Sequence, residues 1–201
     1  MIKKLTIILA LGLGISFTTY GQKGYLDKLW NNLTDSTFSN LVNSNKLVFS
    51  KPVGFNSTSI KKNDNIFYQY AIKDENSNFE IRIFIKSFKQ SSSKKDQIDY
   101  NKFSYSFMSS TALNASGNVL PNIPQIDLFP EDAVQKDFNA NWGATTAFVP
   151  KSEFGKGFNF CAFNCLRLNE VCEVYVFYMF DDAPNQQSLM EKSFLVMTFK
   201  K

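Results

Sequence analysis

The stretch FEIRIFIKSF, residues Phe79–Phe88, decides the fold class because it alternates apolar and polar side chains. Its apolar side chains would share one face: Phe79, Ile81, Ile83 and Ile85. Its charged side chains would share the other: Glu80, Arg82 and Lys86. Alternation of period two is typical of a strand in an antiparallel sheet with one solvated face. We therefore predict a strand here, paired in a hairpin with residues 65–72 across the polar turn 73–78.

The last third of the chain predicts further strands at 158–168, 171–180 and 194–199. Val171–Phe180 is apolar on both faces, which predicts a central strand covered from both sides. Helical spacing predicts shorter elements around these strands: one helix or two within 25–42, a looser pattern over 96–113, and short helices at 130–139 and 186–192. Strands and helices in separate runs predict an α+β fold, with a mainly antiparallel sheet packed with helices.

The N-terminus has the pattern of a secretory signal peptide over residues 1–21. A basic start, Met1–Lys4, precedes the uncharged apolar run Leu5–Phe17, and small residues follow at Thr19–Gly21. The run is shorter than the roughly 20 residues of a membrane span, although an uncleaved anchor is the alternative. No second apolar stretch in the mature chain, 22–201, reaches that length. We expect an exported protein, periplasmic or extracellular, with a single α+β domain over 22–201.

The composition narrows the classes of function. The chain has 201 residues and no histidine, which excludes histidine-based triads, bases and metal ligands. Its formal net charge of +4 falls when a leader carrying Lys3 and Lys4 is removed, so neither nucleic acid nor an anionic membrane is indicated as a partner. We predict no cofactor, no metal site and no recognisable catalytic residue.

Three cysteines lie close together: Cys161, Cys165 and Cys172. Exported proteins form disulfides, and two cysteines four residues apart on one strand are about 13 Å apart, too far to bridge. A two-residue turn at Leu168-Asn169 would place Cys165 and Cys172 opposite each other at about 4.5 Å, which predicts a Cys165–Cys172 disulfide with Cys161 free. A turn shifted by one residue makes the two diagonal neighbours, and a three-residue loop turns them to opposite faces. In the remaining alternative all three are small buried residues.

The many aromatic residues suggest where a ligand would bind. Four of them combine an apolar ring with a polar handle and are our candidate binding residues: Tyr68, Tyr70, Tyr100 and Trp142. The alternative is that they fill the core, as aromatic residues on strands with period two commonly do.

Acidic pairs occur at Asp74-Glu75, Glu131-Asp132 and Asp181-Asp182. Hydrolysis by two carboxylates needs the pair to face each other across a substrate, whereas adjacent acids on a strand point apart. None of these pairs is a site by itself, and a Ser-Lys pair is left open because both residue types are plentiful.

The order of elements resembles that of PsbP-like proteins, over roughly residues 46–199. The stretches that carry the resemblance are Leu47–Pro52, LVFSKP, a strand that runs into a proline, and Lys192–Leu195, KSFL, where a short helix leads into a final strand. The resemblance implies a small exported domain with an antiparallel sheet between helices, and a non-enzymatic accessory or binding role. It assigns no functional residue.

These patterns favour an exported, non-enzymatic binding or accessory protein of the bacterial cell envelope, whose partner is a protein or a small ligand. The alternative is an envelope hydrolase that acts on glycans or peptides through carboxylates or a Ser-Lys pair. A third hypothesis is a surface protein with an exposed apolar interaction patch.

Overall fold

A computed structural model describes residues 30, 31, 33–64, 66–88, 100–117 and 124–201. The predicted leader, 1–21, lies outside the described residues. Within the described parts no helix combines the length and the apolar character needed to cross a bilayer.

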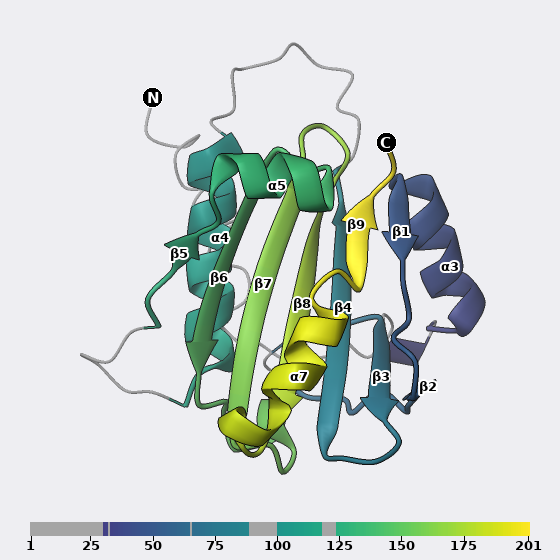
Figure 1. The fold of residues 1–201 in the computed structure, drawn as a ribbon, viewed down its shortest axis with the longest axis vertical. Coiled ribbons are helices and arrows are strands. Elements are labelled where there is room, and N and C mark those ends of the chain that lie inside the picture. Colours follow the sequence, from purple (N-terminus) through teal and green to yellow (C-terminus); the bar gives the residue numbers. More distant parts are fainter. Residues whose placement is uncertain (1–29, 32, 65, 89–99, 118–123) are drawn as a thin grey trace, which may run out of the picture.

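The centre of the molecule is a seven-stranded antiparallel sheet with the strand order β2-β3-β4-β8-β7-β6-β5 (Figure 1). The strands are β2 (Phe55–Ser57), β3 (Tyr70–Asp74), β4 (Phe79–Ser87), β5 (Asp127–Leu128), β6 (Trp142–Phe148), β7 (Phe160–Leu168) and β8 (Cys172–Phe180). A second, two-stranded antiparallel sheet pairs β1 (Leu47–Phe49) with β9 (Met197–Phe199). The predicted α+β fold with a mainly antiparallel sheet is confirmed.

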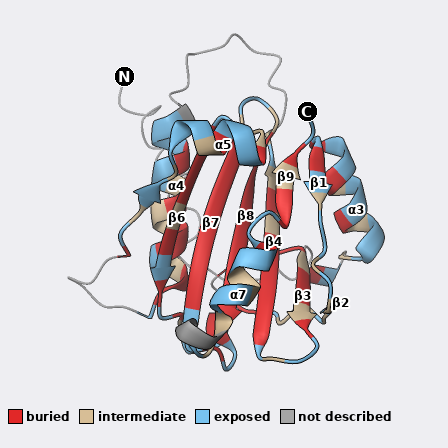
Figure 2. Ribbon diagram, viewed as in Figure 1, coloured by how far each residue is buried: buried red, intermediate tan, exposed pale blue. Residues whose placement is uncertain are grey.

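Helices cover both faces of the large sheet (Figure 1). On the face that we call the front lie α3 (Asp35–Ser44), α5 (Glu131–Phe138), α7 (Ala183–Ser193) and the β1–β9 pair. On the opposite face, the back, lie α4 (Tyr100–Ala115) and the short α6 (Ser152–Gly155). Each face has its own apolar core, so the strands between them are buried along most of their length (Figure 2).

The predicted central strand is confirmed as β8, which lies between β4 and β7 and is buried at every residue. Its side chains alternate between the two cores, with Val174 and Val176 in front and Tyr175 and Phe177 behind. The hairpin predicted for 65–72 and 79–88 is the β3–β4 pair, in which Tyr70 lies opposite Ile83.

The prediction of a solvated charged face on β4 is wrong. Glu80 and Arg82 are fully buried, and Lys86 is only partly exposed. The apolar side chains of β4 face the front core as predicted, but α4, α6 and the segment around Phe158 cover its back face as well. An amphipathic pattern shows which residues share a face, but it does not show whether a later segment covers that face.

The ends of α5 follow from its sequence. Pro130 precedes the helix, and Glu131 and Asp132 in the first turn interact favourably with the positive end of the helix dipole. Asn139 terminates the helix in the left-handed conformation, with φ of 51°, which asparagine tolerates better than most residues. This termination turns the chain into β6.

Candidate functional site

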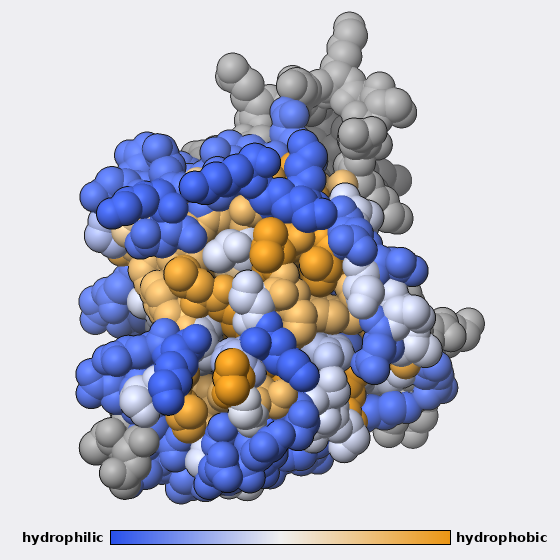
Figure 3. Space-filling view, turned by 45° about the vertical axis from the view of Figure 1, so that its right-hand side comes forward, coloured by the Kyte–Doolittle hydropathy of each residue, from blue (hydrophilic) through white to orange (hydrophobic). Residues whose placement is uncertain are grey.

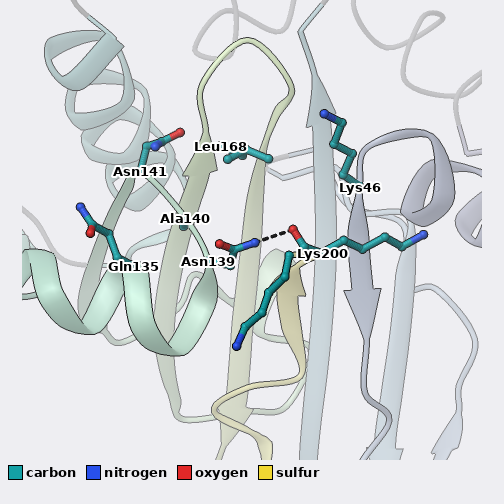
Figure 4. A pocket seen from close by; sticks show the side chains of 8 residues that line it. Lys46, Gln135, Asn139, Ala140, Asn141, Leu168 and Lys200 are labelled. Atoms are coloured by element: carbon teal, nitrogen blue, oxygen red, sulfur yellow. Dashed lines mark hydrogen bonds between the residues drawn. The ribbon is translucent and has the colours of Figure 1, made fainter.

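A cavity of about 560 Å³ lies where the end of α5, the β7–β8 turn, the start of β1 and the end of β9 meet (Figure 4). We call it the lysine pocket. Its lining residues are Lys46, Gln135, Asn139, Ala140, Asn141, Leu168, Lys200 and Lys201.

Backbone turns place the residues of the lysine pocket. Lys46 follows the end of α3 with a left-handed φ of 55°, and its carbonyl accepts a hydrogen bond of 2.8 Å from the amide of Lys200. The side-chain amide of Asn139, at the end of α5, donates to the carbonyl of Lys200 (Figure 4). Three segments that are far apart in the sequence are therefore joined through Lys200.

The lysine pocket is strongly cationic. Three lysines are among the residues that line it, and none of the side chains that the structure describes there is a carboxylate. Among the described residues none of these lysines forms a salt bridge. The negative end of the α5 dipole compensates part of this positive charge, because cations interact favourably with a helix C-terminus. One helix end, equivalent to about half a charge, does not balance three ammonium groups.

The amide side chains add hydrogen-bond donors to the lysine pocket. The Oδ1 of Asn141 accepts from the amide of Asn169 at 2.8 Å, which fixes the orientation of the side chain and leaves its Nδ2 as a donor. Together with the ammonium groups, this is the donor set that suits a carboxylate or phosphate oxygen. The donors of the lysine pocket therefore suit an anionic ligand better than a cationic one.

The predicted aromatic residues do not meet in one site. Tyr68 and Trp142 belong to the back core, whereas Tyr70 packs in front, where its ring stacks on Phe38 at 4.1 Å. Tyr70 also lines a second cavity, of about 430 Å³, between α3 and β1. Tyr100 is the first residue of α4. Binding by these residues stays a prediction.

The polar group of Tyr68, one of these candidates, forms its hydrogen bonds within the protein. Its hydroxyl accepts from the amide of Lys61 at 2.7 Å and donates to the carbonyl of the same residue at 3.1 Å. Burial raises the pKa of Tyr68 to about 12, so the phenol is neutral at physiological pH. Its polar handle is thus satisfied within the protein.

Sequence reasoning missed the lysine pocket. Its lysines occur in polar stretches that are most simply interpreted as solvated charges. Lys46 and Asn139 both reach the pocket through a positive φ. Asparagine adopts a positive φ fairly often, but lysine rarely does, so the sequence did not indicate this conformation at Lys46. The paired Lys200-Lys201 after an apolar strand was the one available hint.

A buried ionic cluster lies on the back face at the start of β4. The Nε of Arg82 lies 2.6 Å from Oε1 of Glu80, and Lys61 pairs with the other oxygen at 3.2 Å. The guanidinium also donates to the carbonyls of Phe154 and Gly155 at the end of α6. It lies over the ring of Phe154, 5.0 Å from the centroid. The cluster therefore fastens α6 to the sheet.

A second buried cluster lies near the other end of the β4–β8 pair. The Ser104 hydroxyl of α4 donates to Glu173 at 2.5 Å and accepts from Arg167 at 2.7 Å. The Tyr175 hydroxyl donates to the other oxygen of Glu173 at 2.6 Å, and Lys86 lies 3.5 Å from that oxygen. The cluster connects α4 to β7, β8 and β4.

Glu80 and Glu173, the two fully buried carboxylates among the described residues, do not form a hydrolytic pair. Glu80 lies opposite Met179 on β8, and Glu173 lies opposite Lys86 on β4. Six residues along the strands separate them by ~20 Å, whereas glycosidase carboxylates are roughly 5–9.5 Å apart. Both carboxylates also have partners within the protein.

Lys86 gives a prediction for pH dependence. Burial lowers the pKa of Lys86 below its usual 10.5, against the smaller, opposing effect of Glu173. Between the lowered folded pKa and 10.5, the unfolded chain binds the proton and the folded protein releases it, so this group makes stability rise with pH. Relative to Lys86→Met, we expect the wild-type free energy of unfolding to increase as the pH rises from neutral towards 10.5. Urea unfolding of both proteins measures this difference, and curves that stay parallel over that range would contradict it.

The predicted Cys165–Cys172 disulfide is corrected by the β7–β8 register. Leu168 lies opposite Cys172, so the turn has three residues and Cys165 lies opposite Tyr175. Cys165 therefore faces the back core and Cys172 the front core, and all three thiols are free and buried. Burial raises the pKa of Cys172 to about 12 and also raises the pKa values of Cys161 and Cys165.

The fold and the lysine pocket define a class: an antiparallel α+β domain, covered by helices on both faces, with a cationic cavity beside its second sheet. No protein-family model matches the sequence, and no curated protein matches it. Among solved structures, the chain is similar to the solution structure of cyanobacterial PsbP (CyanoP) from Synechocystis sp. PCC 6803. That match has a TM-score of 0.44 and 12% identity, and covers 77% of this chain and 87% of the other. The order of elements in the sequence indicated a resemblance to the same family.

Proposed function

We propose that this protein is an exported, non-enzymatic binding protein of the bacterial cell envelope, and that it binds an anionic group of its ligand or partner in the lysine pocket. The observation that carries the proposal is that three lysines line one cavity whose described lining has no carboxylate side chain. The leader pattern of residues 1–21 supports export.

The geometry supports binding better than hydrolysis. The lysine pocket is lined by lysine, amide and apolar side chains, without a serine for a Ser-Lys pair. Glu80 and Glu173 lie near opposite ends of the β4–β8 pair, where Glu80 holds the Arg82 that bonds to α6 and Glu173 accepts from Ser104 of α4. The anion would therefore be held by charge and hydrogen bonds and released unchanged.

Titration calorimetry with inorganic phosphate and with an acetylated triglutamate peptide tests the proposal. We expect both probes to bind at low ionic strength and to bind more weakly as salt is added. The triple variant Lys46→Gln/Lys200→Gln/Lys201→Gln is expected to lose at least about tenfold in affinity, because charge-assisted hydrogen bonds are lost.

A matched variant separates the pocket from net charge. Lys51→Gln/Lys102→Gln/Lys156→Gln removes the same number of charges from exposed positions outside the pocket. We expect it to bind both probes with nearly wild-type affinity. Equal losses in the two triple variants, or no binding by the wild type, would overturn the proposal.

A further inference from the structure

An apolar surface lies in a hollow on the front of the molecule, between α5 and α7, with hydrophilic side chains around it (Figure 3). Phe194 and Leu195, in the connection from α7 to β9, are 38% and 46% exposed. The ring of Phe194 packs on Phe129 and Phe138, with centroid distances of 5.8 and 5.2 Å. We call the surface formed by Phe194, Leu195 and the partly exposed Phe129 the front hollow; the buried ring of Phe138 lies beneath it. A contiguous exposed apolar patch with a polar rim often marks an interaction site.

The front hollow adjoins the lysine pocket. Phe138, the last residue of α5, lies against Phe194 in the hollow, and the next residue, Asn139, lines the pocket and bonds to Lys200. The apolar surface and the cationic cavity are thus adjacent, because consecutive residues at the end of α5 contact one and line the other. A ligand that occupies both must carry apolar groups next to an anionic group.

The shape of the front hollow restricts the kind of ligand. The sheet beneath it is filled, since Leu166, Val174 and Val176 are at most 2% exposed. An acyl chain would need an enclosed cavity that covers most of its surface, and a flat bilayer would not follow a hollow between two helices. An open apolar surface with charge at one end suits a short polypeptide segment, whose side chains spread over it.

We propose that the front hollow and the lysine pocket together dock a polypeptide segment of a partner in which apolar residues adjoin acidic residues. The apolar side chains pack on Phe194 and Leu195, and the carboxylates reach the lysines. The charge of the pocket determines where the acidic end of the segment lies, and the hollow adds affinity. This inference rests on the proposed function of the lysine pocket.

Fluorescence anisotropy with two labelled peptides, LFLEEE and SSSEEE, tests the inference on the intact protein. We expect LFLEEE to bind at least about tenfold more tightly than SSSEEE, because only the first can bury apolar side chains. Phe194→Ser/Leu195→Ser should remove this advantage and leave the affinity for SSSEEE and for inorganic phosphate unchanged. The milder variant Leu195→Ser should reduce the advantage of LFLEEE over SSSEEE in part. It serves as the test if the double variant does not fold.

Controls distinguish the possible failures. Val53→Ser/Leu113→Ser changes two exposed apolar residues elsewhere and should keep the full advantage of LFLEEE. If phosphate binds but the two peptides bind equally, the docking inference fails and the proposed function stands. If phosphate does not bind to the pocket, the proposed function itself fails. Binding to phosphatidylglycerol vesicles that Phe194→Ser/Leu195→Ser abolishes would overturn the inference in favour of a membrane.

Discussion

Replacing Arg82 by methionine is expected to lower the free energy of unfolding by about 3–5 kcal/mol, because the change leaves a buried carboxylate without its closest partner. Arg82 is fully buried and lies 2.6 Å from Glu80. Without the guanidinium, Glu80 keeps only Lys61, whose side chain is 33% exposed and whose attraction is weakened by solvent. The carbonyls of Phe154 and Gly155 also lose the hydrogen bonds that they accept from Arg82. Urea unfolding followed by circular dichroism measures the loss.

Two further variants separate the charge effect from packing. Glu80→Met/Arg82→Met removes both charges and should be more stable than Arg82→Met alone, because no uncompensated charge remains buried. Lys51→Met removes an exposed cation and should change stability by less than about 0.5 kcal/mol. A loss from Arg82→Met as small as that from Lys51→Met would show that the cluster does not hold the back face together.

The second large effect is expected from Phe163→Ala, at about 3–5 kcal/mol of lost stability, because the change leaves a cavity in the back core. Phe163 is fully buried on β7. Its ring stacks on Phe177 with centroids 4.4 Å apart and on Tyr175 at 5.9 Å. Denaturant unfolding measures the loss, and the slope of the transition checks that unfolding stays two-state.

Phe160→Ala is the matched control, because Phe160 lies on the same strand but is 40% exposed. It stacks on one ring, Phe180, at 5.8 Å. We expect a loss of about 1 kcal/mol or less, since much of the side chain is already in contact with water. Equal losses from the two variants would mean that the back core is not close-packed at Phe163.

The sequence predicted well those elements whose pattern is local and complete. Val171–Phe180 is apolar on both sides, and only a strand between two covered faces can bury both sets of side chains, so its central place as β8 followed directly. The short helix predicted at 130–139 is α5, whose start has a local signal as well: a proline followed by two acidic residues.

The sequence predicted less well those features that depend on strand register or on a distant segment that covers a face of the sheet. One additional residue in the β7–β8 turn sends Cys165 and Cys172 to opposite faces, and the sequence around Asn169 allowed two lengths of turn. Glu80 and Arg82 have the pattern of a solvated face, but α6 and Phe158, more than 70 residues later, cover them. The candidate site itself was not predicted, because lysines in polar stretches resemble ordinary surface charges.

By itself the sequence determined the α+β class, the antiparallel sheet and its central strand, because each follows from the spacing of side chains within a single stretch. Only the tertiary structure decided that Lys46, Asn139 and Lys200 meet at one cavity and that Phe194 lies beside it. Those residues come together through hydrogen bonds and packing between segments up to 154 residues apart in the sequence (46 to 200), and no local pattern encodes such contacts.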